Sequence, residues 1–165
     1  YSELYAKLYS DLMTKYPFMK ELFKINFVKF GDVFKNIEYC NPDVNYDKFF
    51  EINKTNEKRR ALSAFYINLM KLNIIDNNSI IEIIQNLQSY MMKLINAENN
   101  KPIVDELSEV LYILVTKSVN ILNKEEAWEN ILDNIKIVSS MRVTDRPSLT
   151  NKSIFKHMDI IDEFN

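Results

Sequence analysis

The chain has 165 residues, enough for one domain with a continuous hydrophobic core but not for two comfortable ones. Glycine occurs once and proline four times, whereas a sheet protein of this length needs many more glycines for its turns. The formal net charge of -2 comes from 21 basic and 23 acidic residues, so the whole molecule is not an electrostatic trap for nucleic acid. We therefore expect an all-α protein in which any RNA contact comes from a local patch.

The first two helices are predicted from apolar residues at helical spacing. Residues 2–15 carry an apolar stripe, which we expect to face the core. The stripe consists of Leu4, Tyr5, Leu8, Leu12 and Met13. Pro17 ends this helix and opens a second one to about residue 36, because proline is tolerated in the first turn of a helix. Gly31 weakens the pattern in the later part of the second helix.

The helical pattern breaks over residues 40–56. This stretch has a proline, several asparagines and an isolated aromatic cluster of Tyr46, Phe49 and Phe50, which predicts a long loop with at most one short helical turn. The pattern returns at about residues 57–72, 79–96, 102–122, 123–138 and 149–164. Seven amphipathic helices in antiparallel pairs are typical of a helical solenoid. A compact bundle is the alternative, because no strict repeat of residue identities is visible.

Catalytic and metal sites lack the residues they need. One glycine cannot form a phosphate-binding loop, a dinucleotide fingerprint or a nucleophile elbow. Cys40 is the only cysteine, which excludes a thiolate zinc site, and His157 is the only histidine, so a histidine-based zinc site or a serine-histidine triad would rest on this one imidazole. We interpret His157 as a partly exposed helical residue. We expect a protein that is no enzyme and binds no cofactor and no metal.

The chain shows no signal for a membrane. No apolar run approaches the roughly 20 residues that span a bilayer. The opening residues lack the basic, apolar and small-residue order of a signal peptide, and the lone cysteine agrees with a reducing compartment. We expect a cytoplasmic protein.

One basic cluster has neighbours that suit RNA. It comprises Lys54, Lys58, Arg59 and Arg60, predicted to lie where the loop meets the next helix. Basic side chains bind RNA phosphates, and the aromatic residues of the loop could stack on a base. Cations are also unfavourable at a helix N-terminus, where the dipole is positive. The cluster predicts an RNA-binding site, with a solvated helix start as the alternative.

Three segments carry motifs in a fixed order. The opening segment has a Tyr-Ala-x-Leu pattern at Tyr5, Ala6 and Leu8. In the central segment a basic run leads into a helix with a following Lys-Leu; its matching residues are Lys58, Arg59, Phe65, Leu69, Lys71 and Leu72. The closing segment matches at Lys152, Phe155, Asp159, Ile160, Ile161 and Asp162. Together they resemble the middle domain of translation initiation factor four-gamma.

This resemblance implies a single domain over residues 1–165, a short right-handed solenoid of HEAT-like antiparallel helix pairs. The family's first helix pair has no counterpart here, so we expect it to be missing upstream of Tyr1. The implied function is a translation initiation scaffold that binds a DEAD-box RNA helicase of the initiation factor four-A type, with mRNA and other initiation factors as further partners. We expect the helicase to contact Arg142, Arg146 and Lys152, and the domain to be a monomer within a larger chain or complex.

Two other functions suit the same residues. Relatives of this domain also act as adaptors in mRNA decay and in cap complexes, so the resemblance leaves that role open. The other alternative is an RNA-binding module that acts through the patch from Lys54 to Arg60.

Overall fold

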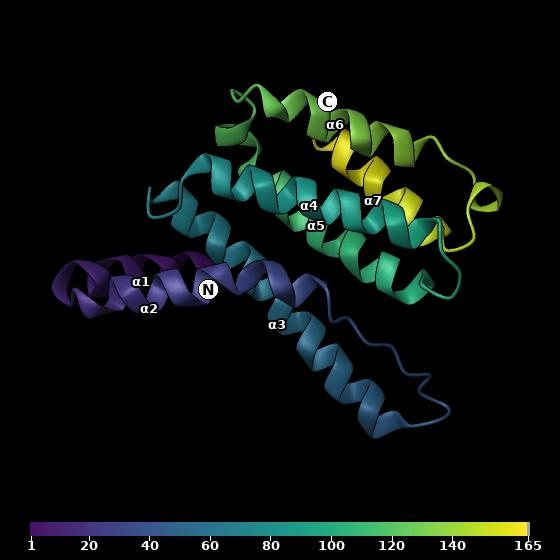
Figure 1. The fold of residues 1–165 in the computed structure, drawn as a ribbon, viewed down its shortest axis with the longest axis horizontal. Coiled ribbons are helices and arrows are strands. Elements are labelled where there is room, and N and C mark those ends of the chain that lie inside the picture. The colour runs from purple at the N-terminus through teal and green to yellow at the C-terminus, as the bar shows by residue number, and fades with distance from the viewer. Residues whose placement is uncertain (165) are drawn as a thin grey trace.

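The computed structural model describes residues 1–164, in which seven α-helices pack against one another and no strand is present (Figure 1). The helices are α1 (Ser2–Lys15), α2 (Phe18–Val28), α3 (Tyr46–Lys71), α4 (Asn77–Ile95), α5 (Lys101–Leu122), α6 (Ala127–Ser139) and α7 (Asn151–Asp162). Two short 3-10 helices, η1 (Phe30–Phe34) and η2 (Val143–Asp145), lie in the connections. The predicted all-α class is confirmed. Among the described residues, no helix is long and apolar enough to cross a membrane.

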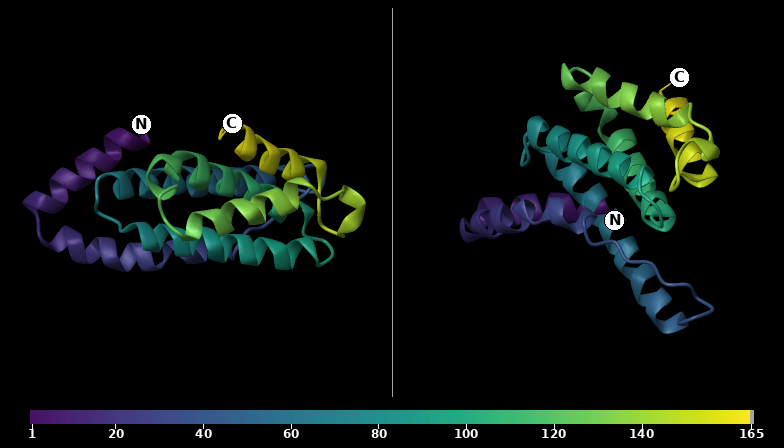
Figure 2. Two further views of the ribbon diagram at one scale, coloured as in Figure 1. Left: turned by 90° about the horizontal axis from the view of Figure 1, so that it is seen from above. Right: turned by 45° about the vertical axis from the view of Figure 1, so that its right-hand side comes forward.

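The odd-numbered helices α1, α3, α5 and α7 pack side by side in chain order. Helix α4 lies against α5, and α6 lies against both α4 and α7, so the even helices cover the odd ones (Figures 1 and 2). Helix α5 is the centre of this arrangement, because it packs on α3, α4 and α7. Its apolar side chains Leu107, Leu111 and Leu114 are fully buried. The core therefore runs along α5.

Helix α3 begins eleven residues earlier than the sequence predicts, so the predicted loop over residues 40–56 is wrong in its second half. The Asn45 side chain caps the helix by accepting a hydrogen bond from the Lys48 N–H at 2.9 Å. No side chain between Tyr46 and Lys58 is fully buried, and this half of α3 projects from the body of the molecule (Figure 2). Because it covers no core, it carries no apolar stripe, which is the signal that reveals a helix in a sequence.

Asparagine takes the place of glycine at the end of α3. Asn73 has a φ of 58°, in the left-handed region. The Ile74 N–H bonds to the Leu69 carbonyl at 3.0 Å, and the Asn73 N–H bonds to the Met70 carbonyl at 2.9 Å. These are the two bonds of a Schellman motif, and asparagine tolerates the left-handed conformation better than most residues. The chain can thus end a helix sharply although it has only one glycine.

The connection between α6 and α7 is anchored by a buried serine. The Ser148 N–H donates to the Ile95 carbonyl at 3.1 Å, and its hydroxyl donates to the Ala97 carbonyl at 2.5 Å. The same hydroxyl accepts from the Asn100 N–H at 2.9 Å. Three backbone groups of the α4–α5 turn are satisfied in this way, which fixes where α7 starts.

His157 lies inside the protein on α7, not partly exposed as the sequence suggests. Its side chain is 1% exposed, and Nδ1 lies 2.7 Å from the Ser153 carbonyl oxygen, to which it donates. Its Nε2 is buried and has no hydrogen-bond partner in the described part of the chain. Burial lowers the pKa of His157 to about 4, although the bond to Ser153 acts in the opposite direction.

This buried imidazole makes folding dependent on pH. Between pH 6.5 and about 4 the unfolded chain binds a proton at His157 and the folded chain does not, so stability falls as pH falls through this window. We expect this residue to remove about 3 kcal/mol from the free energy of unfolding between pH 7 and pH 4. Urea unfolding of the wild type and of His157→Leu over this range isolates the effect, because the carboxylates are common to both. Parallel stability curves for the two proteins would contradict the assignment.

Candidate interaction surfaces

The structure divides the predicted RNA-binding cluster into two pairs. Lys54 and Lys58 are exposed on α3, whereas Arg59 is buried and Arg60 is half-buried. The cluster was expected at a loop-to-helix junction, but it lies inside a continuous helix, where successive side chains point about 100° apart. The two arginines therefore turn towards α5, where Arg60 keeps 37% of its side chain exposed, and the two lysines face water.

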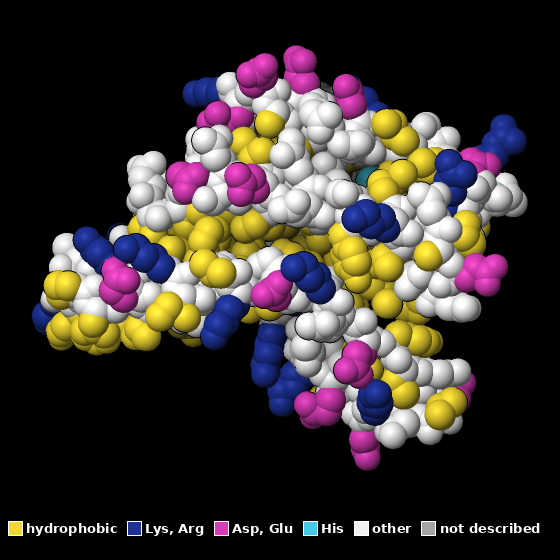
Figure 3. Space-filling model, in the orientation of Figure 1, with side chains coloured by type: hydrophobic (Ala, Val, Ile, Leu, Met, Phe, Trp, Pro, Cys, Tyr) yellow, Lys and Arg dark blue, Asp and Glu magenta, His cyan; other side chains and the backbone are white. Residues whose placement is uncertain are grey.

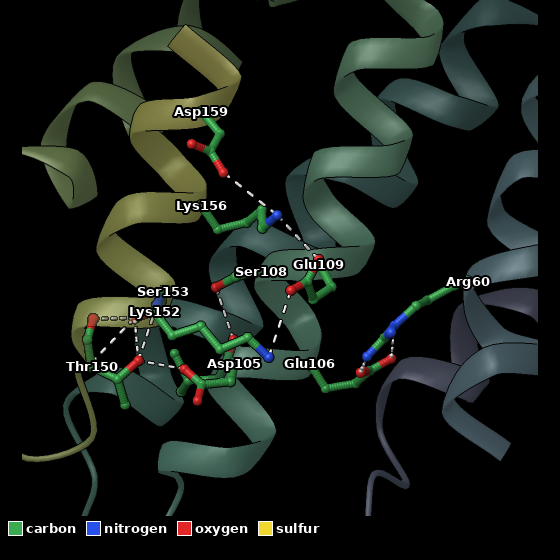
Figure 4. A network of polar contacts seen from close by, with 11 residues as sticks. Arg60, Asp105, Glu106, Ser108, Glu109, Thr150, Lys152, Ser153, Lys156 and Asp159 are labelled. Atoms are coloured by element: carbon green, nitrogen blue, oxygen red, sulfur yellow. Dashed lines mark hydrogen bonds and ion pairs between the residues drawn. The ribbon is translucent and has the colours of Figure 1, made fainter. Parts of the chain in front are cut away.

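The buried arginines share one carboxylate. Glu106 of α5 is 4% exposed and accepts from Arg60 through both of its oxygens, with Arg60 Nε 3.2 Å from Oε1 (Figure 4). Arg59 Nη1 lies 3.7 Å from the same Oε1. Arg59 also donates to the Val33 carbonyl at 2.8 Å and to the Asn56 side chain at 2.5 Å. The hydrogen bond to Glu106 raises the pKa of Arg60, and burial lowers the pKa of Arg59.

A different arrangement of aromatic and basic groups replaces the predicted cluster. Tyr46, Phe50, Lys54 and Lys58 follow one another at intervals of four, and all four are exposed on the projecting half of α3. Residues four apart lie on one side of a helix. This half of α3 also exposes as many carboxylates as cations, with Asp47, Glu51 and Glu57 against Lys48, Lys54 and Lys58. The local charge is therefore balanced, which limits its attraction for RNA phosphates.

The three cations expected to meet a helicase differ in their surroundings. Arg142 and Arg146 flank η2 and are exposed, and neither enters an ion pair with any residue from 1 to 164. The Asp145 carboxylate accepts from the Arg142 N–H at 2.8 Å, which holds the backbone of this turn. Lys152, in the first turn of α7, lies 3.6 Å from the Glu109 carboxylate of α5. The two arginines thus carry charges that no ion pair in residues 1–164 uses, although Arg146 Nη1 donates to the Asp145 carbonyl at 3.4 Å.

A polar network joins α5 to α7 beside Lys152 (Figure 4). Glu109 takes a second cation, Lys156, at 3.4 Å, and Lys156 lies 3.5 Å from Asp159. One turn earlier on α5, the Asp105 carboxylate accepts a hydrogen bond from the hydroxyl of Thr150, which caps α7. These contacts fix the orientation of α7 and leave one of its faces towards water.

That outer face of α7 combines charge with apolar surface. Lys152, Phe155, Met158 and Asp159 recur at helical spacing, and all four are exposed. Phe155 is the most exposed apolar side chain among them, at 59%. An exposed aromatic ring among charged groups is typical of a contact that dominates a protein interface.

The largest departure from the sequence prediction is on α1. Leu4, Tyr5 and Leu8, expected in the core, are each more than half exposed; of the predicted stripe α1 buries Met13, and it buries Ala6, which lies outside that stripe. Helix α2 exposes further apolar residues, and Figure 3 shows hydrophobic side chains along the lower edge of the arm that these two helices form. We call this set the apolar face; it consists of Leu4, Tyr5, Leu8, Tyr16, Phe18, Leu22, Ile25 and Val28. A patch of this kind marks an interaction site.

No protein-family model, curated protein or solved structure matches this chain. Within residues 1–164 there is also no group of three or more His, Cys, Asp or Glu side chains placed to hold a metal ion. The candidate sites described above are three surfaces, namely the projecting half of α3, the outer face of α7 with the neighbouring arginines, and the apolar face.

The shared carboxylate gives a stability prediction. Glu106→Gln leaves Arg59 buried without a counter-charge, so we expect it to lower the free energy of unfolding by about 3 to 5 kcal/mol. Asp133→Asn removes an exposed pair with Lys136 and is the control, with an expected loss below about 1 kcal/mol. Urea unfolding of both variants measures the difference. Equal losses would show that the arginines do not depend on Glu106.

Proposed function

We propose that this chain is a HEAT-like scaffold that binds a DEAD-box RNA helicase of the initiation factor four-A type. The three segments that resemble the middle domain of initiation factor four-gamma fall on α1, α3 and α7. These three helices belong to one row of side-by-side helices, in which α1 packs on α3, α3 on α5 and α5 on α7. Regular stacking of this kind supports a short solenoid over a bundle with a central core.

The observation that carries the proposal is the outer face of α7. Phe155 belongs to the resembling segment but does not contribute to the core, being 59% exposed. Lys152, one turn earlier, and the two unpaired arginines flanking η2 supply positive charge nearby in the chain. A ring that inserts into a partner, with cations around it, provides both affinity and orientation. A scaffold that fits one arrangement of the two helicase lobes better than others stabilises that arrangement.

Binding of the helicase tests this proposal. We expect Phe155→Ala to raise the Kd of the complex at least about tenfold, and Arg142→Glu with Arg146→Glu to raise it similarly. Stimulation of the helicase ATPase should fall in parallel. Ile137→Ala, an equally simple truncation of a half-exposed apolar residue on α6, is the matched control and should leave the Kd unchanged. Absence of any binding or stimulation by the wild type would refute the scaffold.

The row on α3 favours a second, weaker activity, the binding of single-stranded RNA. Lys54 and Lys58 would meet two phosphates, and Tyr46 or Phe50 would stack on a base. We expect Lys54→Glu with Lys58→Glu to abolish this binding, and the wild-type affinity to fall with salt at a slope of about 1.4 in logarithmic units, as two contacts predict. Fluorescence anisotropy with a labelled oligonucleotide measures both. Helicase affinity should be unchanged in this variant, so a parallel loss would place the two ligands on one surface.

A further inference from the structure

The apolar face is too large to be left in water. The eight residues of the apolar face are each 41% to 79% exposed, which sums to on the order of 1,000 Å² of accessible surface over α1 and α2, backbone and tyrosine hydroxyls included. The largest patch on an ordinary monomer is about 300 to 600 Å². A stable interface needs about 800 Å² from each partner. An interface that covers the exposed residues of both α1 and α2 therefore reaches the size of one side of a specific complex.

A row of charges beside this face identifies the partner. Glu3, Lys7, Asp11 and Lys15 recur at intervals of four along α1, and each directly precedes an apolar residue of the same helix or its C-cap. All four are exposed, and none enters an ion pair with any residue in the described part of the chain. Lys15 only approaches the Tyr16 ring, at 5.5 Å from the ring centre. The charges of this row thus alternate in sign, and none of them is paired within the described part of the chain.

This alternating row is complementary to itself when reversed. In an antiparallel pair of α1 helices, Glu3 lies opposite Lys15 of the second copy, and Lys7 lies opposite Asp11 of the second copy. The two-fold axis repeats both contacts, as in the symmetric interfaces of homodimers. A parallel pair would instead place like charges together. Charges that flank an apolar seam set the orientation of paired helices in this way.

We propose that the apolar face is a homodimer interface, formed by two copies of α1 packed antiparallel with their charged rows in register. This partner is independent of the helicase and uses the opposite end of the helix row from α7. It differs from the expectation, drawn from the sequence, of a monomer within a larger chain or complex, and the oligomeric state in solution decides between the two.

A charge swap tests the arrangement by sedimentation equilibrium of the whole chain at about 1 to 100 µM. We expect a dimer for the wild type, and a Kd raised at least about tenfold by Lys7→Glu or by Asp11→Lys, because each places two like-charged pairs across the axis. The double variant Lys7→Glu/Asp11→Lys restores opposite charges between the copies and should recover the wild-type Kd to within about threefold. Leu8→Asp, which puts a charge into the seam, should raise the Kd about 30-fold or more.

The double variant serves as a control for any effect of the substitutions on the stability of α1 itself. Each single variant and the double variant all have two repulsive neighbours and one attractive neighbour at intervals of four within the helix. Only the pairing between copies distinguishes these variants, so recovery of the wild-type Kd in the double variant reports that pairing. Lys136→Glu/Asp133→Lys, the same exchange in an exposed pair on α6, should not affect the Kd. The proposal is overturned if the wild type stays monomeric at 100 µM, or if the two single variants and the double variant have the same Kd. It is also overturned if the chain stays monomeric and binds an amphipathic helix of another protein through this face.

Discussion

The carboxylate of Glu106 joins the two halves of the molecule. It lies on α5, the most enclosed helix, and binds both Arg59 and Arg60 from α3. Arg59 extends the link to the Val33 carbonyl in η1. A buried carboxylate is tolerated only with its cations in place, and a buried arginine only with its anion. The position of α3 along α5 is therefore fixed, and with it the positions of α1, α2 and η1, which pack on α3.

Much of the secondary structure could be predicted because most helices bury one stripe. The segments that became α4 to α7 each repeat apolar residues at helical spacing and end at residues that cap or break helices. The first half of α3 gave no such signal, because its side chains meet water on almost every side. Asn45 was its only sequence marker, and a cap without a following stripe does not distinguish a helix start from a turn.

The sites were harder to predict because their partners lie far away in the sequence. Four cations within seven residues look alike, yet Glu106 pairs with two of them, Arg59, which is buried, and Arg60, which is half-buried. Lys152 is likewise paired with Glu109 from a different helix. On α1, apolar residues occur on two adjacent sides of the helix, and sequence spacing cannot tell which side meets α3. In the structure the side of α1 that carries Ala6 meets α3, because this small side chain lets the two helices approach closely.

The two ends of the helix row, α7 and α1, differ in whether the charges on their outer surfaces are paired. At the α7 end, Glu109, Lys152, Lys156 and Asp159 form ion pairs beside the exposed Phe155 and Met158. Stacked helical proteins end in polar surfaces, because an apolar outer face invites a further layer. The α1 end keeps its apolar face. A further layer there meets the leucines and also the alternating charges beside them. Since that alternation is unchanged by reversal and exchange of sign, a second copy of α1 running in the opposite direction satisfies it, which is the basis of the proposed dimer.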